Sequence, residues 1–322
     1  MKAWRFRRVA VAAALAAAAL LAAGWGQETE EERIKREEKE AYEARCKAFD
    51  VVQTEPGEAP GVSAWLLEQA GNVTRFGRPW AEEPPKLWFP VGEETRYEIE
   101  WGPFTVGEAF ARADWVEVQG RRLLTLTMEA RSNGIVESLY PVKEFMQTLI
   151  DPETFLPLGF EKQSSEGSHK HWELTMFNHA RRSGKWRSKL RLTERDFEIA
   201  EDTRDLMGLM YWIRKTPVRA GEEVTYNVMT DEKLYEMTLG DAKEDTVKLD
   251  RYGKVKCVEI EPKGKFNGMF IRKGRMWVWV SDDERYTICK VTASVPVANI
   301  RVYLTDVEGP GDDFWVTKKR KK

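Results

Sequence analysis

The sequence predicts a mainly β protein in which a large antiparallel sheet curves into an open or half barrel, with one helix covering it. Apolar and polar residues alternate with a period of two in segment after segment, as in Thr95–Trp101, which is typical of strands with one buried face. Short turn sequences separate these segments, and short links join antiparallel neighbours because parallel pairs need long crossovers. A lone amphipathic helix pattern at Asp202–Arg214 carries an apolar stripe that needs a sheet to bury it.

The chain of 322 residues begins with the layout of a secretory signal peptide. Basic residues such as Lys2 and Arg5 precede an apolar run from Val9 to Ala23, and small residues follow it. The run is shorter than the about 20 apolar residues that a spanning helix needs, so an uncleaved anchor is the weaker alternative. We expect a signal peptide over residues 1–26, export to the periplasm or cell envelope, and no integral membrane segment.

Composition narrows the class of protein further. Hydrophobic residues make up 42% of the chain and 13 Trp are spread through it, which supports a folded core. Lys and Arg number 51 against 53 Asp and Glu, a formal net charge of −2. The chain therefore lacks the positive charge of a dedicated nucleic-acid binder.

The predicted regions differ in character. Residues 27–50 are dense in Glu, Lys and Arg without an apolar stripe, and we expect a charged, partly helical arm there. Residues 51–88 combine Pro, Gly and Trp, which predicts an irregular segment that lies over the body or links to it. The β domain is expected over residues 89–309 and a basic tail over residues 310–322.

The strands of the β domain are predicted from their alternation or their apolar runs. Pairs such as Asn133-Gly134, Asp151-Pro152 and Asn267-Gly268 are of the kind that reverses a chain tightly between them. The predicted strands cover residues 95–101, 124–130, 144–150, 156–163, 169–177, 185–192, 224–228, 235–239, 254–261, 269–281, 286–295 and 299–307.

One segment of the β domain has the period of a helix. Its apolar residues at i, i+3, i+4 and i+7 are Leu206, Leu209, Met210 and Ile213. Asp202 or Thr203 can cap its start, and Pro217 prevents its continuation. We expect this helix to plug an open barrel mouth or to cover a concave face of the sheet.

Signatures of catalysis are absent from the sequence. It has no nucleophile elbow, no phosphate-binding glycine loop and no H-E-x-x-H pair. His169 and His171 share a strand face and could bind a metal with Glu161 or Glu173, but without a third spaced ligand a solvated strand edge is favoured. The run 282–284, Asp-Asp-Glu, fits a hairpin turn better than an acid/base pair. We expect no catalytic residue, no cofactor and no metal.

One strand is apolar on both faces. Trp277 and Trp279 share one face, while Met276, Val278 and Val280 fill the other. Such a strand is covered twice, either within a plain core or as part of the wall of an apolar cavity, and plain core packing is the simpler alternative.

The three cysteines do not describe a disulfide-stapled scaffold, because three thiols cannot all pair inside one molecule. Cys257 and Cys289 lie in strand-like segments and could be bridged if those strands are neighbours. The alternative is that both are small buried hydrophobic residues.

An ordered set of short motifs resembles the domain-of-unknown-function 3108 family of exported bacterial proteins over about residues 89–307. The motifs are Phe89-Pro90-Val91-Gly92-Glu93, Tyr97, Trp101-Gly102, Val106-Gly107-Glu108-Ala109, Ala130-Arg131-Ser132-Asn133-Gly134, Asp151-Pro152-Glu153-Thr154, Leu156-Pro157, Tyr211-Trp212-Ile213-Arg214, Gly221, Lys256-Cys257, Phe270-Ile271-Arg272-Lys273-Gly274-Arg275 and Val278-Trp279-Val280-Ser281-Asp282-Asp283. The sequence departs from the family pattern around Ile288 and at Pro296-Val297-Ala298. The resemblance implies an envelope location and a large antiparallel β architecture, and no catalytic activity. By analogy, a half barrel similar to the periplasmic lipoprotein carriers is expected.

These observations lead to a hypothesis of a non-enzymatic envelope protein that binds a lipid or another apolar small molecule in a groove between sheet and helix. The expected lining is Tyr97, Trp101, Leu206, Met210, Ile213, Trp277 and Trp279. The alternative is a structural or interaction module with a solid core, whose charged arm and basic tail contact other envelope proteins. A glycan-cleaving enzyme with an Asp/Glu pair is a third reading that no residue spacing supports.

Overall fold

The computed structural model describes residues 30–322 apart from 55–57, 59–60, 73–82, 216–217, 231, 267–268, 271–274, 296–297, 313 and 316–322. The chain divides into two compact units, residues 1–49 and residues 50–322. The predicted signal peptide over residues 1–26 and the basic residues of the predicted tail, 318–322, lie outside the described residues.

The described part of the first unit is helix α2 (Glu30–Ala48), within the segment expected to form a charged arm. Exposed ion pairs one turn apart line it, such as Lys35 with Glu31 at 2.6 Å and Arg36 with Glu40 at 3.1 Å. Each exposed pair of this kind contributes only about 0.3–0.5 kcal/mol to helix stability. None of the residues of α2 itself is buried.

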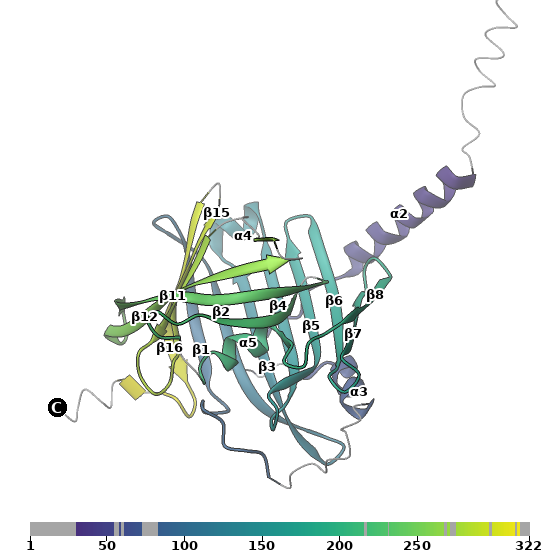
Figure 1. Ribbon diagram of the computed structural model, residues 1–322. Helices are drawn as coiled ribbons and strands as arrows, with labels where there is room; N and C mark the ends of the chain where they lie inside the picture. Colours follow the sequence, from purple (N-terminus) through teal and green to yellow (C-terminus); the bar gives the residue numbers. More distant parts are fainter. Residues whose placement is uncertain are drawn as a thin grey trace, which may run out of the picture. The chain divides into compact units, whose positions relative to one another are not determined.

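The second unit is built on one open sheet, which confirms the predicted mainly β, antiparallel architecture (Figure 1). Its strands are β1 (Glu94–Trp101), β2 (Phe104–Val118), β3 (Arg121–Ser132), β4 (Val142–Asp151), β5 (Leu156–Glu166), β6 (His169–Asn178), β7 (Ser183–Ser188), β8 (Thr193–Glu198), β9 (Arg204–Asp205), β10 (Val224–Thr230), β11 (Lys233–Leu249), β12 (Gly253–Phe266), β13 (Met269–Phe270), β14 (Arg275–Ser281), β15 (Ile288–Val295) and β16 (Ala298–Glu308). Its helices are α3 (Ala64–Asn72), α4 (Gly134–Leu139) and α5 (Leu206–Trp212).

The strand order is β8-β7-β6-β5-β4-β3-β2-β1-β16-β15-β14-β12-β11-β10-β9, with β13 paired to β12. Every pairing is antiparallel except that of β9 with β10. Although β9 ends the order at one edge, it contacts β5 in the other half of the sheet, and α5 contacts β3 and β4 as well as β9 and β10. The sheet therefore curls around α5, as the crossing of β11 over the first strands in Figure 1 illustrates.

Helix α5 is shorter than predicted. The expected helix 202–214, with a cap at Asp202 or Thr203, is wrong at its start, because Arg204 and Asp205 form β9. Asp205 is the actual N-cap, and its carboxylate accepts hydrogen bonds from the Gly208 amide at 2.9 Å and from the Thr148 hydroxyl at 2.8 Å. The buried Thr148 of β4, a contact that the sequence does not reveal, helps to fix the cap at Asp205. Pro217 lies outside the described residues.

The helix is also buried on more than the predicted stripe. Met207 and Tyr211 pack into a cluster with Phe155 and Phe160, while Leu209 packs into a second cluster with residues of β10, β11 and β12. The buried members of α5 are Met207, Gly208, Leu209 and Tyr211. A helix apolar nearly all round is expected inside a core, and α5 fills the space between two walls of the sheet.

Strand β2 is 15 residues long, but it was not among the strands predicted from the sequence. Its buried face is made of Ala109, Ala111 and Ala113, which alternate with Glu108, Phe110 and Arg112. Alanine has little strand preference, so a run of small inward residues does not stand out as a strand. The polar strand β8 was missed as well, because its sequence TERDFE has no apolar alternation.

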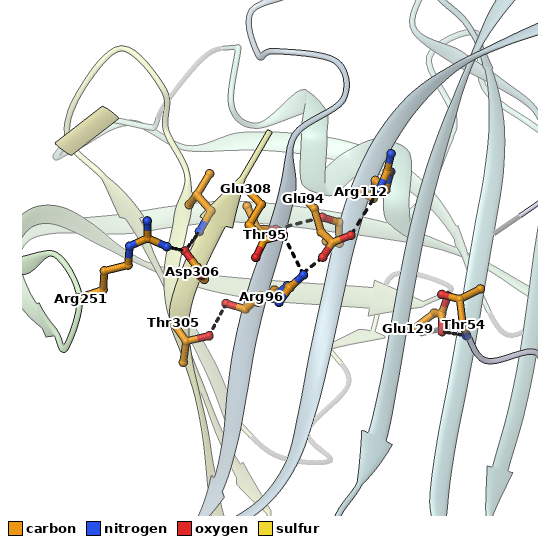
Figure 2. A network of polar contacts seen from close by, with 12 residues as sticks. Thr54, Glu94, Thr95, Arg96, Arg112, Glu129, Arg251, Thr305, Asp306 and Glu308 are labelled. Atoms are coloured by element: carbon orange, nitrogen blue, oxygen red, sulfur yellow. Dashed lines mark hydrogen bonds and ion pairs between the residues drawn. The ribbon is translucent and has the colours of Figure 1, made fainter. Parts of the chain in front are cut away.

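The described residues between 50 and 72, which are 50–54, 58 and 61–72 and are here called the strap, cover the face of β2–β5 opposite α5. The segment expected to be irregular contains helix α3, whose Leu66 is fully buried against Leu123, Leu149 and Leu158. Ahead of α3, the amide and hydroxyl of Thr54 donate to the carboxylate of Glu129 at 2.8 and 2.7 Å (Figure 2). The strap therefore lies over the body, which is one of the two arrangements expected for this segment.

Buried polar side chains on that face satisfy the backbone of the strap. The Val52 amide donates to Gln163 at 3.0 Å, and the Ser63 amide donates to Gln147 at 3.1 Å. Because unpaired backbone groups are costly to bury, these polar side chains are the reason an extended segment can lie on a sheet face.

Candidate functional site

A surface groove lies on β14, β15 and β16. It is formed by side chains on the face of the sheet that points away from α5. It is open to solvent, has a volume of about 740 Å³, and is here called the aromatic groove. Its lining is Trp277, Trp279, Lys290, Thr292, Ser294, Asn299 and Arg301, with Gly102 and Pro103 of the β1–β2 turn.

The strand register explains why these residues meet. Trp279 pairs with Lys290, which pairs with Tyr303 on the next strand. Trp277 pairs in the same way with Thr292, and Thr292 with Arg301. Directly paired residues of an antiparallel sheet share a face, so the period-two pattern of each strand places one continuous row on the surface.

Cations lie against the two indole rings of the groove. The Lys290 ammonium is 3.9 Å from the ring centroid of Trp279, and the Arg275 guanidinium is 4.6 Å from that of Trp277. The indole N–H of Trp279 donates to Asp245 at 2.8 Å. Contacts of this kind orient the rings and contribute about 0.5–1 kcal/mol each at exposed sites.

Carboxylates accompany the cations of the groove. Arg275 binds Glu261 through two hydrogen bonds of 2.8 Å, and this guanidinium holds the pKa of the Glu261 carboxyl below its ordinary value. Arg301 pairs with Glu100 at 2.9 Å. The groove is thus amphipathic and close to neutral, with indole faces beside hydroxyl, amide and paired charged groups.

The structure places the seven expected lining residues in different surroundings. Trp277 and Trp279 line the aromatic groove. Trp101 is 51% exposed and lies next to the Gly102-Pro103 turn that borders it. Tyr97 is half-buried in the cluster that contains Trp279, and burial raises the pKa of its phenol to about 12.

The three helix residues of the expected lining do not reach this groove. Leu206 and Met210 pack against the cluster on one side of α5, and Ile213 packs against the cluster on its other side. Trp88, Phe155 and Trp212 fill the space beside them, with ring centroids 4.5–5.7 Å apart. These three residues therefore take part in core packing, apart from the aromatic groove.

A second hollow, of about 720 Å³, lies between the segment before β1 and the C-terminal segment. Its wall includes the aromatic residues Trp88, Phe89, Trp115 and Phe314, and the buried Arg285. Sequence reasoning missed this hollow because its residues come from loops far apart in the chain, which no periodicity connects.

Arg285 belongs to a buried charge cluster at the edge of the second hollow. Glu93 accepts a hydrogen bond from Arg214 at 3.1 Å and forms an ion pair with Arg285, and all three are nearly inaccessible. Burial lowers the pKa of both guanidinium groups, that of Arg285 to about 10. Arg285 also donates to the Gly311 carbonyl at 2.7 Å, so the cluster joins the residue before β1, the turn after α5, the β14–β15 turn and the C-terminal segment.

The polar residues considered for catalysis or metal binding have structural partners. Asp283 accepts from the Trp315 indole at 2.6 Å and from the Arg285 amide at 3.0 Å, as a turn residue would. Glu161 accepts from Trp172 at 2.8 Å, and His171 lies 3.7 Å from Glu173. Within the described ranges, no group of three His, Cys, Asp or Glu side chains is placed to hold a metal ion.

Ion pairs on the outer side of β1 form a further polar network that serves the sheet (Figure 2). Glu94 lies between Arg96, at 2.9 Å, and Arg112, at 3.5 Å, and Arg96 also reaches Glu308 at 2.8 Å. These contacts link β2, β1 and β16, where the two halves of the sheet join.

Comparison with known proteins gives a family. The sequence matches a family described as "Protein of unknown function (DUF3108)" over residues 96–305. No curated protein matches. In the part of the chain that is described, no helix has the length and apolar character needed to cross a membrane.

The chain is also similar to solved structures at low sequence identity. A β-barrel-like protein of family DUF1849 from Brucella abortus has a TM-score of 0.48 and 9% identity, with 68% of this chain and 98% of that chain covered. A candidate lipoprotein from Parabacteroides distasonis and a candidate exported protein with a YmcC-like fold from Bacteroides fragilis each have a TM-score of 0.28 and 10% identity, covering 70% of this chain and 100% of theirs.

Proposed function

We propose, from the premise that the chain belongs to the DUF3108 family of proteins of unknown function, that it is a non-catalytic cell-envelope protein that binds a lipid or a similar amphiphile. The observation that carries the proposal is the aromatic groove, where a partly exposed indole, Trp277, and a buried one, Trp279, lie beside cations, hydroxyls and an amide. Binding sites for small amphiphiles combine apolar walls with a few polar groups that fix orientation.

The groove offers separate partners for the two ends of such a ligand. The partly exposed Trp277 provides apolar surface, with the 7% exposed Trp279 beneath Lys290 beside it, and indole rings bury large areas at little cost in conformational entropy. Thr292, Ser294 and Asn299 provide uncharged hydrogen-bonding groups at the same wall. Since Arg275 and Arg301 already pair with carboxylates, a neutral or zwitterionic head group fits better than a bare anion.

Exposed aromatic residues extend the apolar surface beyond the groove. Trp101 is 51% exposed and Phe104 is 69% exposed, and they face each other as a pair across the Gly102-Pro103 turn. Large apolar side chains at a loop tip next to a groove indicate a contact with an apolar partner. They would lie along the acyl chain of a ligand whose head occupies the groove.

Brominated lysophosphatidylcholine tests the proposal, because a brominated acyl chain quenches indole fluorescence on contact. The full chain should lose fluorescence saturably below the micelle concentration of the probe, and Trp277→Ala should weaken binding roughly tenfold or more. Trp172→Ala is the matched control, since Trp172 also carries a cation, Lys189 at 5.7 Å, and lines neither of the two hollows described. Equal affinity in both variants, or no quenching in the parent protein, would rule out the groove as the site.

The alternative function is an interaction module without a small ligand. The packing of α5 favours it, because the helix residues expected to line a ligand groove pack into the two core clusters on either side of the helix. It predicts that lysophosphatidylcholine leaves the indole fluorescence unchanged, so the same titration separates the two functions.

A further inference from the structure

Large apolar side chains that lie in solvent gather at one end of the sheet. Trp101 and Phe104 stand on either side of the β1–β2 turn, and Leu139 and Tyr140 lie at the end of α4 and directly after it. Leu139 is 79% exposed, and Met276 near the start of β14 is exposed as well. These five residues are here called the rim. A cluster of such side chains on a folded protein marks a contact with an apolar partner.

The strand register brings the residues of the rim to the same end. Strand β2 begins where β3 ends, because Gly107 pairs with Ser132, and α4, which follows β3, contacts β2. On the other side of β1, Trp101 pairs with the start of β16, whose neighbours β15 and β14 reach the rim at Met276. Figure 1 shows α4 and this end of β15 together at the top of the view.

The apolar surface continues from the rim along the face of the sheet that points to α5. Val280 of this face packs into a cluster with Leu209 of α5, whereas the residues nearer the rim are at least partly exposed. Two rows of directly paired residues make up this part: Trp101, Ile300, Ala293 and Met276 at the rim, and Ile99, Val302, Val291 and Val278 behind it. The rim is therefore the edge of a larger apolar surface.

The arginines close to the rim are neutralised by carboxylates. Arg301 pairs with Glu100 at 2.9 Å, and Arg131 pairs with Glu108 at 2.7 Å. Arg275, beside Met276, binds Glu261 in the same way. Because these cations are paired, the charge of this end complements a zwitterionic surface better than an anionic one.

The shape and composition of the rim favour a bilayer over a protein partner. Its side chains come from separate turns, whereas a stable protein–protein interface buries a patch of about 800 Å² on each partner. Trp and Tyr side chains prefer the membrane interface, where the ring is buried and the polar N–H or O–H stays wet. Tyr140 is held in place for such a contact, because its ring lies on Gly167, where a Cβ would come within 2.7 Å of it.

We propose that the rim docks on a phospholipid bilayer with zwitterionic head groups and inserts its apolar side chains into the interfacial layer. The proposal goes beyond the function proposed above, because the rim can dock whether or not the aromatic groove holds a lipid. The Gly102-Pro103 turn, which lies between Trp101 and Phe104, also borders the groove. Docking would therefore bring the groove close to the head groups of the bilayer.

Flotation with vesicles of phosphatidylcholine and phosphatidylethanolamine tests the docking. The protein is recovered in soluble form from the periplasm of a bacterial host, and all variants are prepared in the same way. Intact masses show that the apolar run 9–23 is treated alike in every sample. We expect the parent protein to float with the vesicles and Leu139→Ser to partition about fivefold or more weakly, because a leucine side chain leaves the interface. A parent protein that stays in the soluble fraction would overturn the proposal.

Leu192→Ser is the matched control for that variant. Leu192 is 68% exposed and follows β7 in the β7–β8 turn. Ser188, the last residue of β7, pairs with Glu173 in the interior of β6, so this turn stops short of the rim. Leu192→Ser should partition like the parent protein, and circular dichroism checks that both variants are folded. Equal partitioning of the two leucine variants would refute the assignment to the rim.

Hydrogen exchange locates the contact without a substitution. Vesicles should slow the exchange of backbone amides in residues 101–106 and 134–140 and leave the β7–β8 turn unchanged. Slower exchange confined to other parts of the chain would contradict docking through the rim. High salt should leave flotation unchanged, because the arginines close to the rim are paired; release of the protein by salt would show that anionic attraction, and not apolar insertion, binds it.

Two further measurements separate this proposal from its neighbours. Sedimentation velocity without vesicles detects pairing of two copies, and a loss of dimer in Leu139→Ser with unchanged flotation would show that the rim is a protein interface. Leu139→Ser should bind brominated lysophosphatidylcholine like the parent protein, and Trp277→Ala should float like it, because Trp277 lies on the opposite face of the sheet. Failure of flotation with intact lysophosphatidylcholine binding would refute docking alone, and the reverse result would refute the groove alone.

Discussion

The two halves of the sheet carry the same alternating pattern but differ in what covers their outer face. In β2–β5 the outer face is covered by the strap, and polar side chains such as Gln147 and Gln163 satisfy the backbone that lies on them. In β14–β16 the outer face carries Trp277 and Trp279 and remains an open groove. An outer face rich in buried polar groups thus serves the chain itself, whereas the open groove leaves the partly exposed Trp277 available to another molecule, with Trp279 buried beside it.

The charge cluster that joins the two halves should produce the largest loss of stability. Glu93→Gln removes the carboxylate that Arg214 and Arg285 share in a buried site. We expect the free energy of unfolding to fall by about 4 kcal/mol, because two buried guanidinium groups lose their charge partner. Urea unfolding measures the change.

Glu308→Gln is the matched control for that variant. Glu308 pairs with Arg96 at 2.8 Å but is far more exposed than Glu93, so the loss should stay below about 1 kcal/mol. Equal losses in the two variants would show that burial does not decide how much an ion pair contributes to the free energy of unfolding at this junction.

Removal of the side chain that anchors the strap should lower stability more than removal of an aromatic side chain from the open half of the sheet. Leu66→Ala deletes a fully buried side chain between α3 and the sheet, and we expect a loss of about 3 kcal/mol in urea unfolding. Trp277→Ala, on the open face, should cost clearly less, because Trp277 remains partly exposed. A larger effect at Trp277 would mean that the groove is structural.

The face of the sheet opposite the strap should also make stability depend on pH, through Glu144, whose side chain points to the same side as that of Met146. Burial raises the pKa of Glu144 to about 7 from an ordinary value of 4.5, with the Ser164 hydroxyl opposing the shift. A raised carboxyl pKa stabilises the fold fully below pH 4.5, and this contribution is lost as the pH rises toward 7.

Glu144→Gln isolates that contribution. Relative to the parent protein, the variant should become more stable by about 1–2 kcal/mol between pH 4.5 and pH 8, after allowance for solvent screening. Asp205, whose pKa burial raises to about 6, contributes in the same direction and remains in both proteins. A constant difference between the two proteins over this range would contradict the assignment to Glu144.

The sequence predicts the architecture well and the site only in part, for physical reasons. The alternation that marks β14 as apolar on both faces singles out Trp277 and Trp279 from the sequence alone, since period two is a local property of the chain. The extent of α5 is not local, because its cap depends on Thr148, a residue 57 positions before Asp205. The Glu93 cluster likewise depends on contacts between distant loops.

The strap shows the same limit. Its polar contacts depend on Glu129, Gln147 and Gln163, which read as ordinary polar strand positions until the chain that covers them is placed. Sequence periodicity assigns such residues to solvent, and only the folded arrangement shows that they are buried.

Substitution of the groove lysine should have the smallest effect on stability and the most selective effect on function. Lys290→Met removes the ammonium 3.9 Å from the Trp279 ring and 5.7 Å from the Tyr303 ring while keeping an unbranched side chain. Because a partly exposed cation–π contact contributes about 0.5–1 kcal/mol, the loss in urea unfolding should not exceed that range.

The affinity for brominated lysophosphatidylcholine should fall severalfold if the ammonium contacts the head group. Lys189→Met, next to Trp172, gives the matched loss of a cation on the covered half of the sheet and should leave that affinity unchanged. Equal affinities for both variants would show that the open face does not use its cation, and the contrast between the two halves would then rest on the indoles alone.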